Sequence, residues 1–219
     1  MAVSPDLTLD ELRMALAPAV ADSAVFDGWT ELAVANAANL EGADPEVARF
    51  AFKGGAMAMI AAWIAATDRA MAEALPPEKL AGLKIRERIR TLVQFRLDAV
   101  AGQQEALRRA LAIMAMPHNA ADALRLGWRS ADAMWRLAGD IATDYNHYTK
   151  RMTLGALYAS TLAFYAYDES EGFAETRAFL DRRIDDVMQF EKLKAQLLRH
   201  DAERFSVARF LGRLRYPAR

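Results

Sequence analysis

The chain has 219 residues, which suffices for one medium-sized domain with a sizeable buried core. Hydrophobic residues make up 53%, which excludes a disordered protein, and the absence of cysteine excludes disulfides, thiolate metal sites and cysteine nucleophiles. The formal net charge of -1 is unevenly divided, because residues 1–75 hold 4 basic and 11 acidic residues whereas residues 192–219 hold 8 basic and 2 acidic ones.

The predicted secondary structure is helical almost throughout, because apolar residues do not alternate at the period of two that a strand requires. Thr8 and Glu11 form a capping box at the start of the first helix, and Pro76-Pro77 ends the long fourth helix. In chain order, the predicted helices cover about residues 8–23, 31–40, 46–52, 54–75, 78–100, 103–114, 120–137, 144–167, 173–198 and 205–214.

Two stretches of the chain are nearly uncharged, Gly54–Thr67 and Met152–Tyr167, and both are too short to span a bilayer. Each therefore predicts a buried helix rather than a membrane span. The first residues, MAVSPDLTLDEL, carry acidic side chains where a signal or transit peptide needs basic ones, so no targeting segment is expected there.

Three short helices, a long fourth helix and a helical body give the layout of TetR-type regulators, whose second and third helices form a helix-turn-helix. The candidate recognition helix carries Asp44 and Glu46 where a DNA-reading helix needs cations and amides. Residues 1–75 also carry a net charge of -7, which repels phosphates. The sequence therefore predicts an all-α, TetR-like fold that binds no nucleic acid. The predicted domains are a degenerate helix-turn-helix head at 1–53, a helical-bundle body at 54–198 and a basic amphipathic tail at 199–219.

No arrangement of reactive side chains in the sequence fits a catalytic or metal site. His118, His147 and His200 have a spacing that matches no ligand motif. The sequence has no nucleophile elbow, no phosphate-binding loop and no dinucleotide fingerprint. Asp140 and Asp144 flank a predicted loop and are explained as residues at helix ends, where Asp144 complements a helix dipole. We therefore predict that the protein is not an enzyme and has no catalytic residue, metal or cofactor.

Three segments form the most distinctive motif of the chain: MPHN at 116–119, AMWRLAGD at 133–140 and TDYNHYTKR at 143–151. Together with FAETRAFLDRRIDDVM at 173–188, they resemble the ubiquinone (coenzyme Q) biosynthesis accessory lipid-binding family. This family includes the ninth Coq protein of mitochondria and its proteobacterial relatives. The resemblance begins at about Leu80, and the first helices match the family only in layout, through GWT and FAFKGG.

The resemblance implies a TetR-like fold that has abandoned DNA, with an apolar pocket for an isoprenoid or quinone lipid. It also implies a surface patch that docks on the di-iron hydroxylase of ubiquinone synthesis, and a C-terminal amphipathic helix that meets the membrane. The family's docking patch lies on the positions of Met134, Trp135, His147 and Tyr148. The chain departs from the mitochondrial members at His147, where they carry tryptophan.

The candidate lipid-binding residues are chosen on two grounds: the apolar pocket that the resemblance implies, and a stripe of apolar residues along one helix. Tyr158, Leu162 and Tyr165 recur at i, i+4 and i+7, which by default is the buried face of a helix. Methionine and aromatic residues also line adaptable lipid pockets, so both core and pocket stay open for each residue. The predicted lipid-binding set is Met116, Trp128, Met134, Trp135, Tyr158, Leu162 and Tyr165.

A second candidate site is a protein-binding surface at the start of the predicted helix 144–167. Residues 145–151 occupy consecutive helical positions, so they do not all face the core, and exposed aromatics beside Lys and Arg are typical of protein interfaces. The alternative is a tyrosine whose hydroxyl reaches out of the core. The predicted partner-binding set is Met134, Trp135, Tyr145, His147, Tyr148, Lys150 and Arg151.

The last predicted helix is amphipathic and basic. Val207, Phe210, Leu211 and Leu214 lie at i, i+3, i+4 and i+7, a pattern that suits an anionic membrane surface when arginines surround it. The alternatives are that this helix folds back on the body or swaps onto another subunit. The predicted membrane-binding set is Arg204, Phe205, Val207, Arg209, Phe210, Leu211, Arg213, Leu214 and Arg215.

From the residues and the resemblance together, we predict a non-catalytic lipid-binding accessory protein of ubiquinone biosynthesis. It is expected to bind polyprenylated quinone precursors and to present them to a hydroxylase, in the bacterial cytoplasm at the surface of the inner membrane. The TetR-like layout predicts a homodimer. Two alternatives stay open: a TetR-type transcriptional regulator that senses a hydrophobic ligand, and a helical scaffold that binds no ligand.

Overall fold

The computed structural model of the chain describes residues 7–141 and 145–203, and every regular element within these ranges is helical. This confirms the predicted all-α fold. Short 3-10 helices, η1 (Pro117–Asn119) and η2 (Glu171–Phe173), precede the eighth and tenth α-helices. The α-helices are α1 (Leu9–Asp27), α2 (Glu31–Glu41), α3 (Pro45–Ala51), α4 (Gly55–Ala74), α5 (Pro77–Leu80), α6 (Ile85–Asp98), α7 (Gln104–Met114), α8 (Ala120–Leu137), α9 (Tyr145–Tyr165) and α10 (Ala174–Glu203).

The chain divides into two units, Met1–Asp181 and Arg182–Arg219. The first unit contains α1–α9 and the beginning of α10. The second contains the rest of α10, where the side chains of Arg183 and Asp186 form an exposed ion pair at 2.7 Å. α10 continues past its predicted end at residue 198. The predicted domain boundaries after residues 53 and 198 stay predictions.

The capping box predicted at the start of α1 is confirmed. The backbone N–H of Thr8 donates to the Glu11 carboxylate at 2.9 Å, and the Glu11 N–H donates to the Thr8 hydroxyl at 3.3 Å. α1 runs beyond its predicted end at Ser23 and stops at Gly28, whose φ of +70° lies in the left-handed region that favours glycine.

The helix predicted over residues 78–100 is wrong, because the structure has two helices there, α5 and α6. The chain turns between Leu80 and Lys84, around Gly82, and α6 starts where the Lys84 N–H donates to the Glu87 carboxylate at 3.0 Å. Arg88 stabilises the turn by donating to the carbonyl oxygens of residues 81 and 83, each at 2.8 Å. These long-range side-chain bonds are not visible in a helical periodicity.

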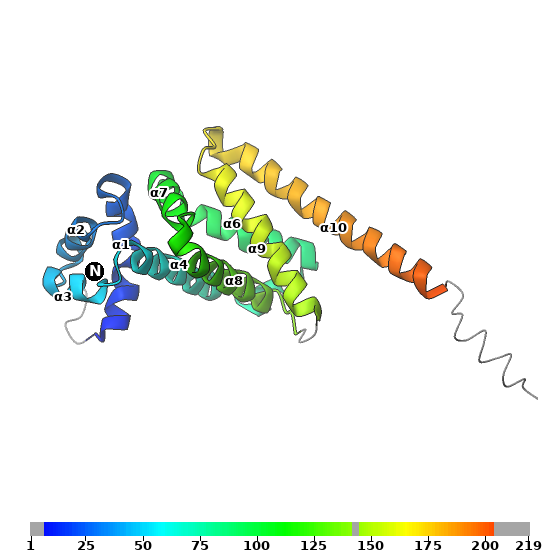
Figure 1. Ribbon diagram of the computed structural model, residues 1–219, viewed down its shortest axis with the longest axis horizontal. Coiled ribbons are helices and arrows are strands. Elements are labelled where there is room, and N and C mark those ends of the chain that lie inside the picture. Colours follow the sequence, from blue (N-terminus) through cyan, green and yellow to red (C-terminus); the bar gives the residue numbers. More distant parts are fainter. Residues whose placement is uncertain (1–6, 142–144, 204–219) are drawn as a thin grey trace, which may run out of the picture. The chain divides into compact units, whose positions relative to one another are not determined.

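Helices α1, α2 and α3 form a head at one end of the first unit, and α4 leads from it into the body (Figure 1). Fully buried alanines, among them Ala17, Ala21 and Ala37, allow α1 and α2 to approach closely. Arg13 of α1 also donates from Nε to the carbonyl oxygen of Ala51 at 2.8 Å, which holds the end of α3. Small side chains therefore allow close helix packing in the head, and Arg13 ties α1 to the end of α3.

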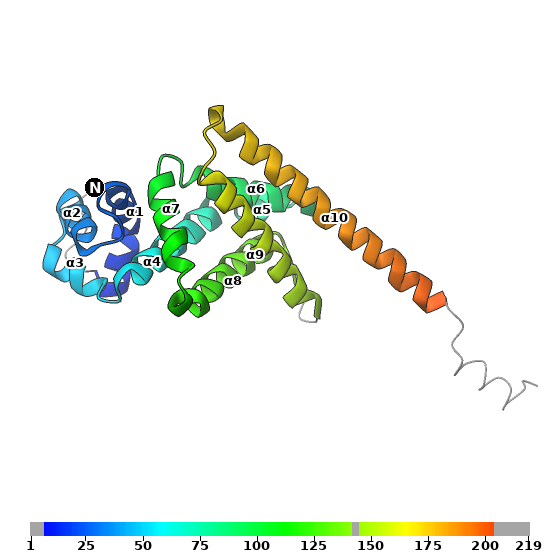
Figure 2. The same ribbon diagram turned by 45° about the horizontal axis from the view of Figure 1, so that its top comes forward.

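The body of the first unit consists of α4 and α6–α9, with α8 and α9 packed against each other and α9 also packed on α6 and α7 (Figure 2). Buried apolar residues from several helices form its core, including Leu92 of α6, Met134 of α8 and Leu154 of α9. Among the described residues, no single helix is long and apolar enough to cross a membrane. α3 and α4 meet that test only as a pair, and they are bent by 89° where they join.

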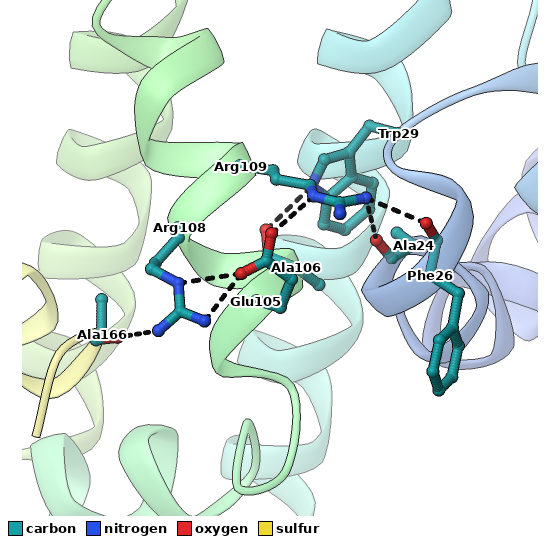
Figure 3. A network of polar contacts seen from close by, with 8 residues as sticks. All are labelled: Ala24, Phe26, Trp29, Glu105, Ala106, Arg108, Arg109 and Ala166. Carbon is teal, nitrogen blue, oxygen red and sulfur yellow. Dashed lines mark hydrogen bonds and ion pairs between the residues drawn. The ribbon is translucent and has the colours of Figure 1, made fainter. Parts of the chain in front are cut away.

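The head is joined to α7 by Trp29 and by Arg109 (Figure 3). Trp29 is 5% exposed, packs on the ring of Trp63 at 5.3 Å and donates from Nε1 to the Ala106 carbonyl at 2.9 Å. Arg109 bonds to Glu105 and to the carbonyl oxygens of residues 24 and 26 at the end of α1. The head and the body therefore share one buried junction.

Asp168 fixes the turn that leads from α9 to α10. Its carboxylate accepts hydrogen bonds from the N–H of Ser170 at 2.8 Å, and from the N–H and hydroxyl of Thr176 at 2.8 and 2.5 Å. Burial raises the pKa of Asp168, but these hydrogen bonds outweigh burial and hold the pKa at about 2. The turn is therefore stabilised by the ionised carboxylate.

Replacing Asp168 with asparagine is expected to lower the free energy of unfolding at neutral pH by about 2 kcal/mol. A depressed folded-state pKa contributes stability that is complete above the ordinary value of 3.8 and is lost as pH falls through about 2. Urea denaturation from pH 7 downward should therefore show the two proteins converging below pH 4. Glu169→Gln, at the exposed neighbouring position, serves as the control, and a constant gap down to low pH would contradict this role for Asp168.

Candidate binding cavity

A cavity of about 530 Å³ lies inside the body of the first unit, between α4, α6, α7, α8 and α9. Its volume is in the range of small-molecule sites, about 300–1,000 Å³. Most of its wall is aliphatic or aromatic, as expected for a site that receives an apolar ligand. Apolar residues of the wall include Ile60, Trp63 and Ile64 of α4, Leu107, Leu111 and Met114 of α7, Leu126 and Trp128 of α8, and Tyr158 and Leu162 of α9.

The cavity opens to solvent through apolar side chains. Leu124 of α8 and Met152 of α9 both line it, yet they are 76% and 66% exposed. Ala156 and Ala159 of α9 also line the cavity and are exposed. Because these exposed apolar side chains line one cavity together, rather than lying singly over the surface, they indicate a binding region. These four residues form the mouth of the cavity.

Two helical glycines create part of the space. A Cβ atom built on Gly127 of α8 would have no neighbouring atom within 4 Å, and one on Gly155 of α9 would only touch the Cβ of Ala131 at 4.0 Å. Neither glycine has a positive φ, so the backbone conformation does not require glycine at either position. Both glycines line the cavity, which indicates that they leave room for a ligand rather than shape the backbone.

One charged residue, Arg96 of α6, forms part of the inner wall, and its side chain is only 2% exposed. Its guanidinium pairs with Asp68 of α4 through Nη1 and donates from Nη2 to the Ser130 hydroxyl of α8 at 3.2 Å. It also lies 4.8 Å from the ring centre of Tyr158. In the part of the chain that the structure describes, its Nε has no hydrogen-bond partner. A buried donor without a partner normally costs about 1–3 kcal/mol.

The surroundings of Arg96 keep it charged. Burial lowers the pKa of the guanidinium, but the oxygens of Tyr158 and Asp68 outweigh burial and raise it. Burial also raises the pKa of Asp68, and Arg96 and Ser130 offset only part of that effect. The inner wall therefore carries a paired, fixed positive group in an otherwise apolar site.

The predicted lipid-binding residues separate into two groups in the structure. Trp128, Tyr158 and Leu162 line the cavity. Tyr165 instead packs on Phe173 with its ring centre at 4.6 Å, although it continues the same stripe of α9. The other three also lie away from the wall: Met116 is 44% exposed before η1, Met134 is fully buried inside the body, and Trp135 donates from Nε1 to the Lys150 carbonyl at 2.9 Å.

Two of the predicted partner-binding residues are buried, so the structure corrects their assignment to the surface. Met134 is 0% exposed and packs in the core. The Arg151 side chain is 2% exposed and forms ion pairs with Asp132 at 2.6 Å and with Asp140 at 3.0 Å. Lys150 completes this α8–α9 ion cluster by contacting Asp140 at 2.6 Å. Arg151 therefore joins α9 to α8 rather than facing a partner.

His147 and Tyr148 of that set form an aromatic surface together with Trp128 of the lipid-binding set, in which Tyr148 is exposed and the other two residues are half-buried. Tyr148 is 58% exposed, with its ring centre 5.9 Å from Trp128 and 5.2 Å from His147. Trp128 also lines the cavity, so the aromatic surface of Trp128, His147 and Tyr148 adjoins it. The predictions that lie outside the described residues are those for the Tyr145 side chain and for Arg204, Phe205, Val207, Arg209, Phe210, Leu211, Arg213, Leu214 and Arg215.

Sequence reasoning missed Arg96 and placed Arg151 on the wrong face. A signal was present in both cases. Arg96 follows Ile89, Leu92 and Val93 at the i+7 position of an apolar stripe, where a leucine would be ordinary. Arg151 lies three residues before Leu154 on the buried stripe of α9. An arginine on an apolar stripe indicates a buried ion pair, because a lone buried charge is too costly.

Within residues 7–141 and 145–203, no group of three or more metal-ligating side chains comes together. The pKa of Tyr165 is raised to about 12, chiefly by burial, but this hydroxyl lies among packed aromatic residues rather than in the cavity.

Comparison with known proteins identifies a family that the central part of the chain resembles. Residues 120–191 match the COQ9 family model. The chain is 31% identical over 186 residues to the mitochondrial ubiquinone biosynthesis protein COQ9 of Homo sapiens, covering 82% of this chain and 58% of the human one. It is 39% identical over 100 residues to COQ9 of Rattus norvegicus, covering 46% of this chain and 32% of the rat protein. The chain thus spans less than two thirds of the length of these relatives.

Among solved structures, the chain is similar to the crystal structure of a TetR transcriptional regulator from Nitrosomonas europaea. The TM-score is 0.60 at 24% sequence identity, and the match covers 78% of this chain and 97% of that one. At this identity the likeness shows the fold alone, and it confirms the predicted TetR-like architecture. The resemblance expected from the central motifs is confirmed as well, since residues 120–191 match the COQ9 family model.

Proposed function

We propose that the protein is a non-catalytic, lipid-binding accessory protein of ubiquinone biosynthesis that holds a polyprenylated quinone precursor in its body. The observation that carries this proposal is the apolar cavity with an apolar mouth between α8 and α9. Polyprenyl tails are nearly insoluble in water, so moving one from a bilayer to an enzyme requires an apolar container.

The size of the site and its opening support a long ligand. A cavity of about 530 Å³ encloses a ring and part of a tail, and the remaining tail passes out beside Leu124 and Met152. The flexible Met114 and Met152 side chains are suited to walls that adapt to irregular ligands. The similarity to proteins named for ubiquinone biosynthesis supports the choice of a quinone precursor.

The surface of Trp128, His147 and Tyr148 is proposed as the docking face for the hydroxylase that uses the lipid. Tyr148 is exposed, Trp128 and His147 are half-buried, and the three rings pack on one another, which is a composition that protein interfaces favour at their centres. The face shares Trp128 with the cavity, so a partner bound there would lie beside the stored ligand. Contact of the C-terminal basic segment with a membrane, and a homodimer, complete the proposal.

The head gives little support to the alternative of a DNA-binding regulator. In the recognition position, α3 places Glu46 and Phe50 on its exposed side, and Arg49 is paired with Glu46. Lys53 lies over the ring of Phe50 at 5.0 Å. Phosphate contacts need cations that are available to the DNA, and residues 1–75 carry a net charge of -7.

Organic extraction and native mass spectrometry of the purified full chain test the lipid-binding proposal. We expect an isoprenoid lipid to co-purify with the wild-type protein. Gly127→Phe should lower the bound lipid roughly tenfold or more, about 1.4 kcal/mol, because the new ring occupies open space in the cavity. In a strain from which the gene has been deleted, the wild-type gene should restore ubiquinone and Gly127→Phe should not.

Gly127→Ala is the matched control for this variant. It adds one methyl group at the same helical position, should stabilise α8 by roughly 0.5–1 kcal/mol, and should retain lipid. Circular dichroism verifies that both variants keep their helices. A wild-type protein without lipid, or a Gly127→Phe protein with an undiminished load, would contradict the proposal.

A further inference from the structure

We infer that Arg96 binds the polar end of the cavity's ligand, and that this end is an uncharged oxygen acceptor such as a quinone carbonyl, an ether or a hydroxyl. The Nε–H of Arg96 donates the hydrogen bond. This inference rests on the proposed lipid-binding function and adds to it the ligand's orientation, its chemical class at the inner end and the residue that selects it.

The first argument is the unpartnered donor. Arg96 has a side chain that is 2% exposed and forms part of the cavity wall, and its Nη1 and Nη2 atoms are bonded to Asp68 and Ser130. Its Nε is buried and has no hydrogen-bond partner among the described residues. A ligand oxygen at the inner end of the cavity would satisfy this donor once the wall atoms that cover it shift, whereas a pure hydrocarbon would leave it unsatisfied.

The second argument is that the guanidinium is held in place before a ligand arrives. Asp68 of α4 and Ser130 of α8 fix its two terminal nitrogens from different helices, and the Ser130 hydroxyl lies 3.3 Å from Asp68. The ring of Tyr158 lies 4.8 Å from its Cζ atom. A donor fixed from three helices loses little side-chain freedom on binding, which favours recognition of a defined acceptor.

The third argument concerns charge. The positive charge of Arg96 is already balanced by Asp68, so a ligand carboxylate would bring a second anion beside that aspartate. The other arginine that touches the cavity, Arg151, is itself paired with Asp132 and Asp140. The cationic groups of the wall are therefore neutralised, and the unpartnered Nε–H of Arg96 matches an uncharged acceptor better than an anion.

The fourth argument is orientation. Arg96 is buried, whereas Leu124 and Met152 at the mouth are mostly exposed and apolar. An amphiphile therefore enters with its oxygen-bearing ring towards Arg96 and leaves its tail between α8 and α9. This orientation buries the polar end and presents the tail to an apolar surface such as a bilayer.

Three probes that share one ten-carbon tail test the inference with the full chain stripped of lipid: a decyl-substituted benzoquinone, decylbenzene and 4-decylbenzoate. Binding is measured by isothermal titration calorimetry, which detects all three probes in the same way. We expect the benzoquinone to bind about tenfold or more tightly than decylbenzene, as one hydrogen bond to a charged donor supports. We also expect it to bind more tightly than the benzoate.

Two double variants then test the residue. Arg96→Gln with Asp68→Asn removes the pair without leaving a single buried charge, and should abolish the preference for benzoquinone over decylbenzene. Arg90→Gln with Asp181→Asn is the control, because it neutralises another Arg–Asp pair of α6 that lies away from the cavity, with Arg90 54% exposed. The control should keep the preference.

The outcomes separate the two proposals. If the wild-type chain binds none of the probes, the container function fails and the inference fails with it. If it binds benzoquinone and decylbenzene equally, or binds the benzoate most tightly, the container function stands and the assignment of an uncharged acceptor is overturned. A preference that survives in the Arg96→Gln, Asp68→Asn variant overturns the role of Arg96. The wild-type comparison needs no variant, so the test does not depend on how the double variant folds.

Discussion

Replacing Arg151 with methionine is expected to lower the free energy of unfolding by about 3–5 kcal/mol, the cost of removing one partner from a buried ion pair. The guanidinium is 2% exposed and lies between Asp132 and Asp140, whose side chains are 20% and 4% exposed. Methionine fills a similar volume but leaves both carboxylates without this cation. Lys150 still reaches Asp140, but it is 39% exposed and compensates only in part.

Arg136→Ala provides the matched control for Arg151. Arg136 pairs with the same Asp132 at 2.8 Å, but its side chain is 73% exposed, so its loss should cost roughly 0.5 kcal/mol or less. Guanidinium denaturation followed by circular dichroism measures both variants. Equal losses for Arg151→Met and Arg136→Ala would show that the α8–α9 ion cluster contributes no more than a surface pair.

Replacing Trp29 with alanine is expected to cost about 3–5 kcal/mol, because a large buried ring is removed from the junction between head and body. Trp29 packs on Trp63 of α4 and bonds to the Ala106 carbonyl of α7, so its side chain touches two helices of the body at once. The effect should appear as a lower midpoint in urea denaturation.

Trp29→Phe separates packing from hydrogen bonding at the same position. Phenylalanine retains an aromatic ring against Trp63 but lacks the N–H that reaches Ala106, so a loss of about 1–2 kcal/mol is expected. The expected order of stability is wild type, then Trp29→Phe, then Trp29→Ala. If the alanine variant is as stable as the phenylalanine variant, packing of the aromatic ring does not stabilise the contact between head and body.

The helices were predictable from the sequence because their signals are local. The capping box of Thr8 and Glu11 and the break at Pro76-Pro77 act within one helical turn, and both stand in the structure where the sequence placed them. The break between α5 and α6 was missed. Its sole local sign is Gly82, and the arginine that stabilises it, Arg88, acts through carbonyl oxygens that any residue supplies.

The candidate site was predictable only in part, because a helical stripe does not distinguish a packed core from a cavity wall. Tyr158 and Tyr165 share one stripe of α9, yet the first lines the cavity and the second packs on Phe173. What separates them is the absence of side chains at Gly127 and Gly155 on facing helices, which is a property of the three-dimensional arrangement.

The charged residues of the site show the same limit. Arg96 finds its partner Asp68 28 positions away, and Arg151 finds Asp132 19 positions away. Neither separation is one at which two side chains meet on a single helix. The sequence showed that an arginine occupied an apolar stripe, but only the fold shows which carboxylate makes its burial tolerable.

The two sides of the junction in Figure 3 differ in how many substitutions they tolerate. On the head side, Arg109 binds carbonyl oxygens, including that of Phe26, whose side chain is 84% exposed; any residue that keeps α1 helical supplies the same acceptor. On the body side, the single carboxylate of Glu105 orients both Arg109 and Arg108, and Arg108 in turn binds the Ala166 carbonyl at the end of α9. Side chains on the surface of the head can therefore change without loss of these bonds, whereas a substitution at Glu105 would remove the carboxylate that orients both arginines at once.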